Sequence, residues 1–228
     1  ALELEAVAHF VLAGCLFYLF ARRAVGSGAA AMLGALAFTY GGYLTGYPPL
    51  QLAVLESNAW LPAALLGAAC IVDSASKQGG PAWHGIALCS VAVGMSVLAG
   101  HPQSALYLIA VLLAFAGWSL RPRYVDRSRA VTRFALAAAL AAGLSAAGWL
   151  PALEFLRLSN RALSDYAALS HGFPPRELLG ALLPGMTLWS PLYVGVLPVL
   201  LAATAVGRWA RSGPGNGAHG SGADSEPP

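Results

Sequence analysis

The chain has 228 residues, of which 57% are hydrophobic and only 10% are charged, and its mean hydropathy is +0.64. A soluble domain has about one quarter charged residues, so this composition excludes an ordinary soluble protein. The net charge of +3 is small, and the basic residues lie between apolar runs, where membrane topology accounts for them. We therefore expect membrane lipids as partners and no nucleic acid.

Seven apolar runs follow one another along the chain. They cover residues 4–21, 27–45, 50–72, 83–99, 103–118, 130–150 and 192–209. Each is close to the roughly 20 residues that a helix needs to cross a bilayer, and each is continuous rather than alternating in polarity. The pattern predicts an all-α, polytopic transmembrane bundle of about seven spans over residues 1–211. A disordered Gly, Ser and Pro-rich tail is expected over residues 212–228.

The basic residues concentrate in every second gap between the runs. Ten of the thirteen are Arg22, Arg23, Lys77, Arg121, Arg123, Arg127, Arg129, Arg133, Arg208 and Arg211. The intervening gaps hold only Arg157, Arg161 and Arg176. The positive-inside bias then predicts a multi-pass membrane protein with the amino end outside and the carboxyl end in the cytoplasm.

Small residues dominate the second and sixth runs, so we expect these two helices at the centre of the bundle. Between the second and third runs, residues 49–58 follow a Pro pair and are expected to form a short interfacial or re-entrant helix. Cys15, Cys70 and Cys89 each lie inside an apolar run without a partner at metal-ligand spacing. We interpret the three cysteines as small packing residues and predict no metal site built from them.

The unusual polar residues fall on the side predicted to be extracytoplasmic. Glu56 and Asn58 precede Trp60, and an ionisable group this close to the hydrocarbon is a functional candidate or an interfacial residue. Gly100, His101, Pro102 and Gln103 form a forced turn between two runs. Its polar side chains have two interpretations: Gln103 caps a helix and His101 bonds a carbonyl group, or His101 faces a ligand.

The largest predicted outer segment covers residues 151–191 and opens with an amphipathic stretch, residues 151–158, which could lie along the membrane surface. Within that stretch Glu154 and Arg157 are three residues apart and could form an ion pair. Further on, Arg161 and Arg176 depart from the charge rule. They are either solvated or available to bind a phosphate group.

The order of short motifs along residues 6–205 resembles the YfhO-like bacterial membrane proteins, which are related to GT-C-type glycosyltransferases. The matching stretches are 8–14 (AHFVLAG), 18–22 (YLFAR), 36–43 (LAFTYGGY), 58–62 (NAWLP), 98–107 (LAGHPQSALY), 149–154 (WLPALE) and 193–198 (YVGVLP). Each stretch is short, and the GHPQ element and the ordered series carry the resemblance.

This resemblance implies an enzyme that transfers a sugar from a polyprenyl-phosphate carrier to an acceptor in the cell envelope. In such enzymes an acidic residue on the first large outer loop is expected to act as base or metal ligand. The chain resembles a fragment that begins after that loop and lacks the carboxyl-terminal spans, so we expect it to be inactive alone. The catalytic base is therefore unknown, and a divalent cation is a possible cofactor.

Several residues of this chain are candidates for the remaining chemistry. The catalytic candidates are Glu56, His101 and Glu154. The candidates for substrate binding are Asn58, Trp60, Gln103, Tyr107, Arg161, Arg176 and Tyr193. Two alternatives remain: a transporter or flippase for lipid-linked envelope precursors, and a non-catalytic membrane assembly protein. A transporter usually places ionisable groups near the bilayer midplane, whereas the run interiors here hold almost none.

Overall fold

The computed structural model describes residues 2–46, 51–76, 80–121, 124–158, 175–181, 183 and 192–212. This part of the chain is helical, and its only β interaction is an isolated bridge between Ser76 and Val125. The elements are α1 (Leu2–Val25), α2 (Gly28–Tyr40), α3 (Gly42–Thr45), α4 (Leu52–Ala59), α5 (Leu61–Ser74), α6 (Trp83–Leu98), α7 (Pro102–Ser119), α8 (Arg127–Leu144), α9 (Ala146–Leu158), the 3-10 helix η3 (Pro175–Ala181) and α11 (Val196–Ser212). The predicted all-α class is confirmed.

Three helical stretches are long and apolar enough to cross a membrane: α1, the combined α4 and α5 (Leu52–Ser74), and α7. The pair α8 and α9 would be a fourth span, although it bends by 71° at their junction. Two further apolar helices, α6 and Val196–Arg208 of α11, are shorter. A membrane-embedded helical protein follows. Three helices of the described residues, or four if the bent pair is one span, are long enough to cross, and the predicted number of seven goes beyond what this shows.

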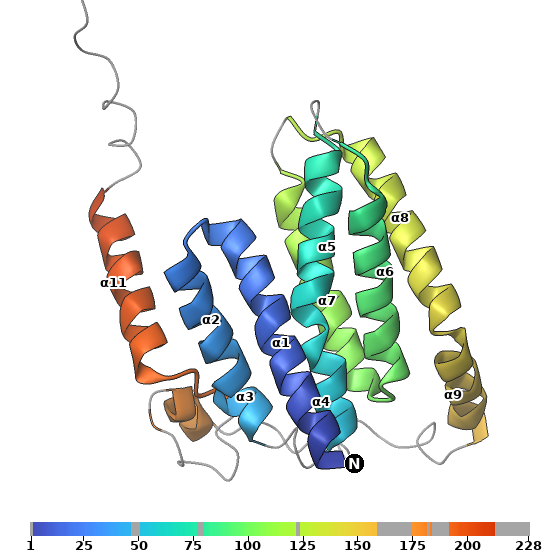
Figure 1. Cartoon of the computed structure of the whole chain (residues 1–228), viewed down its shortest axis with the longest axis horizontal. Helices are drawn as coiled ribbons and strands as arrows, with labels where there is room; N and C mark the ends of the chain where they lie inside the picture. Colours follow the sequence, from blue (N-terminus) through green and yellow to red (C-terminus); the bar gives the residue numbers. More distant parts are fainter. Residues whose placement is uncertain are drawn as a thin grey trace, which may run out of the picture.

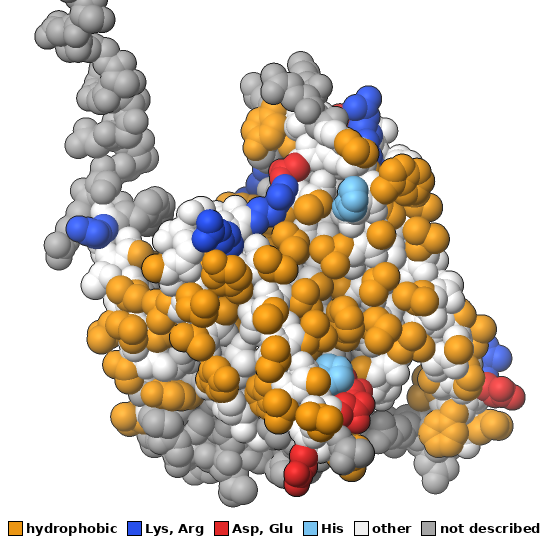
Figure 2. Space-filling view, viewed as in Figure 1, with side chains coloured by type: hydrophobic (Ala, Val, Ile, Leu, Met, Phe, Trp, Pro, Cys, Tyr) orange, Lys and Arg blue, Asp and Glu red, His pale blue; other side chains and the backbone are white. Residues whose placement is uncertain are grey.

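The long helices lie side by side, and successive ones along the chain run in opposite directions (Figure 1). The start of α1, α3, α4 and the turn from α6 to α7 lie at one end of the bundle, which we call the polar end. The ends of α1, α5 and α7 lie at the other, together with the start of α8. Lys and Arg side chains gather mainly at this second, arginine-rich end (Figure 2).

The helix buried in the bundle is α5, not either of the runs rich in small residues. Eight of its fourteen residues are buried, against three of thirteen in α2 and three of eighteen in α8. The prediction that the small-residue runs are central is therefore wrong. Small side chains allow close approach at single points of contact, but they do not determine how many neighbours a helix has.

The tightest helix contact joins α5 to α6. A Cβ atom on Gly67 would lie 2.6 Å from the backbone nitrogen of Cys89, and one on Gly85 would lie 2.9 Å from that of Ile71. The two backbones thus touch where each helix has a glycine. Cys89 is buried against Gly67, and the Cβ atom of Cys70 lies against Gly85, as their interpretation as packing residues predicts. The glycines supply the close backbone approach that holds membrane helices together.

In this region the structure has α4, a largely buried helix that continues into α5, not an independent interfacial one. Val54, Leu55 and Ala59 of α4 are buried, and Leu55 packs with Ala13 and Leu44 in a cluster that joins α1, α3 and α4. The break between α4 and α5 at Trp60 therefore lies between the buried residues Ala59 and Pro62, as expected for irregular backbone within a membrane protein.

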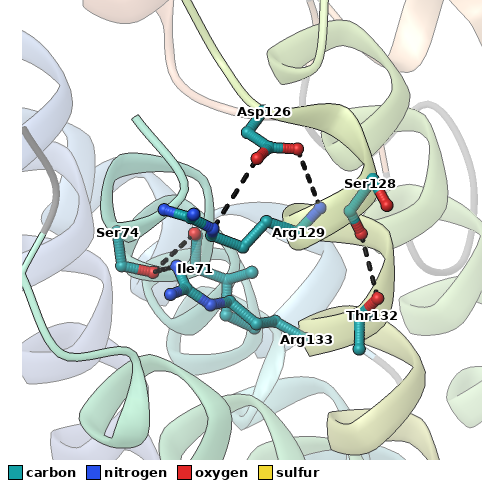
Figure 3. A network of polar contacts seen from close by, with 7 residues as sticks. All are labelled: Ile71, Ser74, Asp126, Ser128, Arg129, Thr132 and Arg133. Carbon is teal, nitrogen blue, oxygen red and sulfur yellow. Dashed lines mark hydrogen bonds and ion pairs between the residues drawn. The ribbon is translucent and has the colours of Figure 1, made fainter. Parts of the chain in front are cut away.

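At the arginine-rich end, polar contacts attach the start of α8 to the end of α5 (Figure 3). Arg133 donates to the hydroxyl of Ser74 at 2.7 Å, and Ser74 donates to the carbonyl of Ile71 at 2.7 Å. Asp126 caps α8 by accepting from the backbone N–H of Arg129 at 3.0 Å. These bonds determine where α8 begins relative to α5.

Thr39 of α2 carries a buried hydroxyl that makes no hydrogen bond within the described residues. It lies against Gly14 of α1. An unpaired buried hydroxyl costs roughly 1–3 kcal/mol, so Thr39→Val is expected to leave the free energy of unfolding unchanged or raise it by about 1 kcal/mol. The matched variant is Thr45→Val, because the Thr45 hydroxyl donates to Gly41 at 2.9 Å. Reversible unfolding in detergent should show a lower free energy of unfolding for Thr45→Val. An equal decrease for Thr39→Val would contradict the assignment of the Thr39 hydroxyl as unpaired.

Candidate functional site

Three consecutive polar residues of α4 each face a different neighbouring helix. Glu56, Ser57 and Asn58 are separated by about 100° around the helix axis, so they cannot share one face. Glu56 interacts with α1, Ser57 with α6 and Asn58 with α7. The chain thus places its polar chemistry around one short, buried helix at the polar end.

Asn58 is 9% exposed and connects α4 to the start of α7. Its amide nitrogen donates to the carbonyl of Val54 at 2.7 Å and to the hydroxyl of Ser104 at 3.1 Å. The Ser104 hydroxyl in turn lies 2.8 Å from Nδ1 of His101. A buried relay therefore runs from Asn58 through Ser104 to His101.

His101 caps α7. Gly100, with φ of +81°, allows the chain to reverse directly after α6, and His101 accepts at Nδ1 from the backbone N–H of Ser104 at 3.2 Å. The Asn58 amide donates to the Ser104 hydroxyl, so that hydroxyl is free to donate to Nδ1 as well. This assignment leaves the hydrogen on Nε2, which makes His101 a donor there and disfavours a role as base. The structural interpretation of the turn is wrong in its details, because His101 and not Gln103 caps α7, and the His101 ring contacts Ser104 rather than a carbonyl group.

Glu56 lies at the contact of α4 with α1, within electrostatic reach of Glu5 and His9. His9 is oriented by a hydrogen bond between its Nδ1 and the carbonyl of Glu5 at 2.9 Å. With Nδ1 as donor, Nε2 of His9 carries the lone pair, and this imidazole lies within electrostatic reach of the Glu56 carboxyl group at the polar end. Sequence reasoning assigned no role to Glu5 and interpreted His9 as a helix-packing residue rather than a catalyst. Their one signal was the spacing of four residues, which places both on one face of α1.

Ser57 pairs with Ser96 of α6. Both are fully buried, and their hydroxyl oxygens lie 2.8 Å apart, while Ser57 also lies 3.0 Å from the carbonyl of Ser96. Sequence analysis did not single out either residue, since serines are common in apolar helices. Their bond fixes α4 against α6, so it supports the site without being available to a ligand.

The other predicted binding residues have local roles. Trp60 is half-buried against the core formed by α5, α6 and α7. Gln103 donates to the hydroxyl of Tyr107 at 2.7 Å on the exposed side of α7. Tyr193 is half-buried, and its carbonyl accepts from the backbone N–H of Gly42 beside α2 and α3. The described contacts do not bring Tyr193 to the Asn58–His101 relay.

Glu154 lies on α9, which is exposed over residues 150–158 and turns 71° from α8. Among the described residues no ion pair joins Glu154 to Arg157, so the predicted pairing of these two is wrong. The helix has no buried residue that would fix either side chain. Arg161, and the side chain of Arg176, lie outside the described part of the chain.

The polar end thus has two clusters on opposite sides of α4: Glu5–His9–Glu56, and the relay that ends at His101. The first can exchange a proton, and the second presents an N–H donor. In the parts of the chain that the structure describes, no group of three or more His, Cys, Asp and Glu residues has the geometry to hold a metal ion. Comparison of the chain with protein-family models, with characterised proteins and with solved structures gave no match.

Proposed function

We propose that this chain is part of a GT-C-like membrane glycosyltransferase that moves a sugar from a polyprenyl-phosphate carrier to an acceptor outside the cytoplasm. The observation that carries the proposal is the buried α4 helix, whose Glu56 and Asn58 lead to His9 and His101 at the end opposite the arginine-rich one. The ordered motifs of the YfhO-like proteins give the reaction class.

The proposed topology follows from the charges. The arginine-rich end faces the cytoplasm and the polar end faces outward, in a bacterial inner membrane. The seven runs are seven crossings, of which α2, α6 and α11 are short, and α9 lies along the outer surface. Residues that precede α1 would then reach the polar end directly beside Glu5 and His9.

The proposed chemistry gives each of the two clusters a different role. Transfer from a lipid phosphate requires a base for the acceptor hydroxyl and stabilisation of the departing phosphate. The Nε2–H of His101 suits stabilisation of the departing phosphate, because it is a hydrogen-bond donor on a ring that Ser104 holds in place. Glu56 and His9 suit the removal of the proton from the acceptor hydroxyl, together with the acidic residue of an outer loop that the family resemblance implies.

The test is Glu56→Gln in the full-length protein. Because amide and carboxyl groups have nearly the same size, packing against α1 should be kept while proton transfer is lost. We expect the rate of sugar transfer from a polyprenyl-phosphate sugar to fall by roughly 10²–10⁴-fold, the usual contribution of a general base. Radiolabelled transfer in membrane vesicles measures this rate.

The control is Glu3→Gln, which removes an exposed carboxylate from the same end of α1. It should keep full activity. Equal activity of Glu56→Gln and wild type would remove Glu56 from the reaction. Absence of any sugar transfer by the wild-type protein, combined with carrier-lipid translocation across vesicles, would favour a flippase over an enzyme.

A further inference from the structure

An apolar groove lies between α6, α7 and α8. Its volume is about 690 Å³, within the range of ligand-binding pockets. Val93 of α6, Leu112 and Ala116 of α7, and Phe134 and Ala138 of α8 are among its lining residues. The alanines of α8 leave the space open, since larger side chains there would fill it.

Polar atoms along the groove are already bonded within the protein. The Ser145 hydroxyl donates to Ala141 at 2.8 Å, and the Trp149 indole donates to Ala142 at 2.9 Å. The groove thus offers an entering molecule almost no hydrogen bond along its length. It suits a hydrocarbon chain and is unsuited to a polar substrate.

One end of the groove carries cations. Leu120 and Val131 line that end, and Arg127 donates from Nε to the Leu120 carbonyl at 3.1 Å. The guanidinium of Arg121 lies 4.3 Å from the centre of the Trp118 ring. Trp118 is exposed at the end of α7, and Trp149 lines the opposite end of the groove, as expected of interfacial residues that bracket a hydrocarbon layer.

The two cations at this end lack acidic partners in the described residues. The ion pairs found there join Arg23 to Asp73 and Arg129 to Asp126. Arg121 and Arg127 bond only carbonyl groups and an aromatic ring. A negative charge placed at this end would therefore complement two positive charges directly above an apolar groove.

We propose that the groove binds one anionic phospholipid, with its phosphate at Arg121 and Arg127 and an acyl chain between α7 and α8. The lipid enters from the leaflet at the arginine-rich end, so it is distinct from a carrier lipid used at the polar end. It completes the packing of α8, which touches the bundle mainly through α6. Basic residues near a membrane surface favour anionic lipids in this way.

The test is native mass spectrometry of the full chain released from micelles that contain phosphatidylglycerol or phosphatidylcholine with the same acyl chains. We expect one retained phosphatidylglycerol per chain and weaker retention of phosphatidylcholine. Arg127→Gln should reduce phosphatidylglycerol retention about fivefold, the effect of removing one basic residue near an anionic surface. Arg22→Gln removes one charge from the same end on α1, away from the groove, and should have little effect.

A second pair of variants tests whether the groove binds the acyl chain of the lipid. Ala138→Phe fills the groove and should abolish retention, whereas Ala139→Phe, one position further along α8 and outside the groove, should keep it. Helical circular dichroism and a single gel-filtration peak check folding. The proposal would be overturned if both lipids were retained equally, or if Ala138→Phe had no effect on retention. It would also be overturned if the chain preferred polyprenyl phosphate and Arg127→Gln did not change this preference. A dimer that Ala138→Phe separates into monomers would overturn it too. None of these readouts depends on sugar transfer.

Discussion

Gly67→Ala is expected to lower the free energy of unfolding by roughly 1–3 kcal/mol, the usual cost of overpacking a well-packed contact. The added Cβ atom would lie 2.6 Å from the backbone nitrogen and 2.9 Å from the Cα atom of Cys89. Neither atom can move without shifting α6. Because α5 is largely buried and contacts α1, α6, α7 and α8, the shift should spread through the bundle. Reversible unfolding in mixed micelles measures the loss.

The matched control is Gly143→Ala in α8. Nothing lies within 4 Å of its added Cβ atom, so only the helix propensity changes. Alanine should stabilise this exposed position by about 0.5–1 kcal/mol. A loss at Gly143 as large as the loss at Gly67 would show that glycine flexibility, rather than close packing of α5 on α6, is responsible.

Asn58→Leu is the second change with a large expected effect. Leucine has a similar volume but cannot donate to Val54 or Ser104, so the Ser104 hydroxyl is left without its donor inside the protein. Removing one partner of a buried hydrogen bond costs roughly 1–3 kcal/mol. We expect this loss of stability, together with loosening of the start of α7 that hydrogen exchange of residues 102–106 should detect.

Two further variants separate the relay from simple packing. Ser104→Ala removes the middle of the relay, and a double-mutant cycle with Asn58→Leu should give a coupling of about 0.5–3 kcal/mol. His101→Asn keeps a side chain that can cap α7, so stability should be close to that of the wild-type protein. A coupling near zero would mean that Asn58 and Ser104 act independently, which would contradict the relay.

Much of the fold follows from the order of apolar and polar residues. The apolar runs predicted helices at α1, α5, α6 and α7, and Gly100 with Pro102 predicted the abrupt turn between two of them. These features are local: helix length depends on an apolar run, and a reversal depends on backbone that glycine alone tolerates easily. The helical class was accessible from sequence for that reason.

Only part of the candidate site could be predicted from the sequence. Glu56, Asn58 and His101 are conspicuous as polar residues among apolar neighbours, but nothing in the sequence identifies Glu5, His9 and Ser104 as their partners. Sequence spacing shows that Glu56 and Asn58 face different directions, yet it does not say which helix lies in each direction. The pairing of Glu56 with α1 and of Asn58 with α7 depends on helix order in the bundle, which no local pattern encodes.

By itself, the sequence determined a membrane-embedded helical protein whose arginines concentrate in alternate gaps, because hydrophobic length and charge are properties of single segments. Only the tertiary structure decided that α5 is the buried helix, that α4 distributes three polar residues to three neighbours, and that α6, α7 and α8 leave an apolar groove open. The physical reason is the same in each case. Burial depends on how many helices surround a segment, and packing between helices is set by contacts, such as Gly67 with Cys89, between residues far apart in the chain.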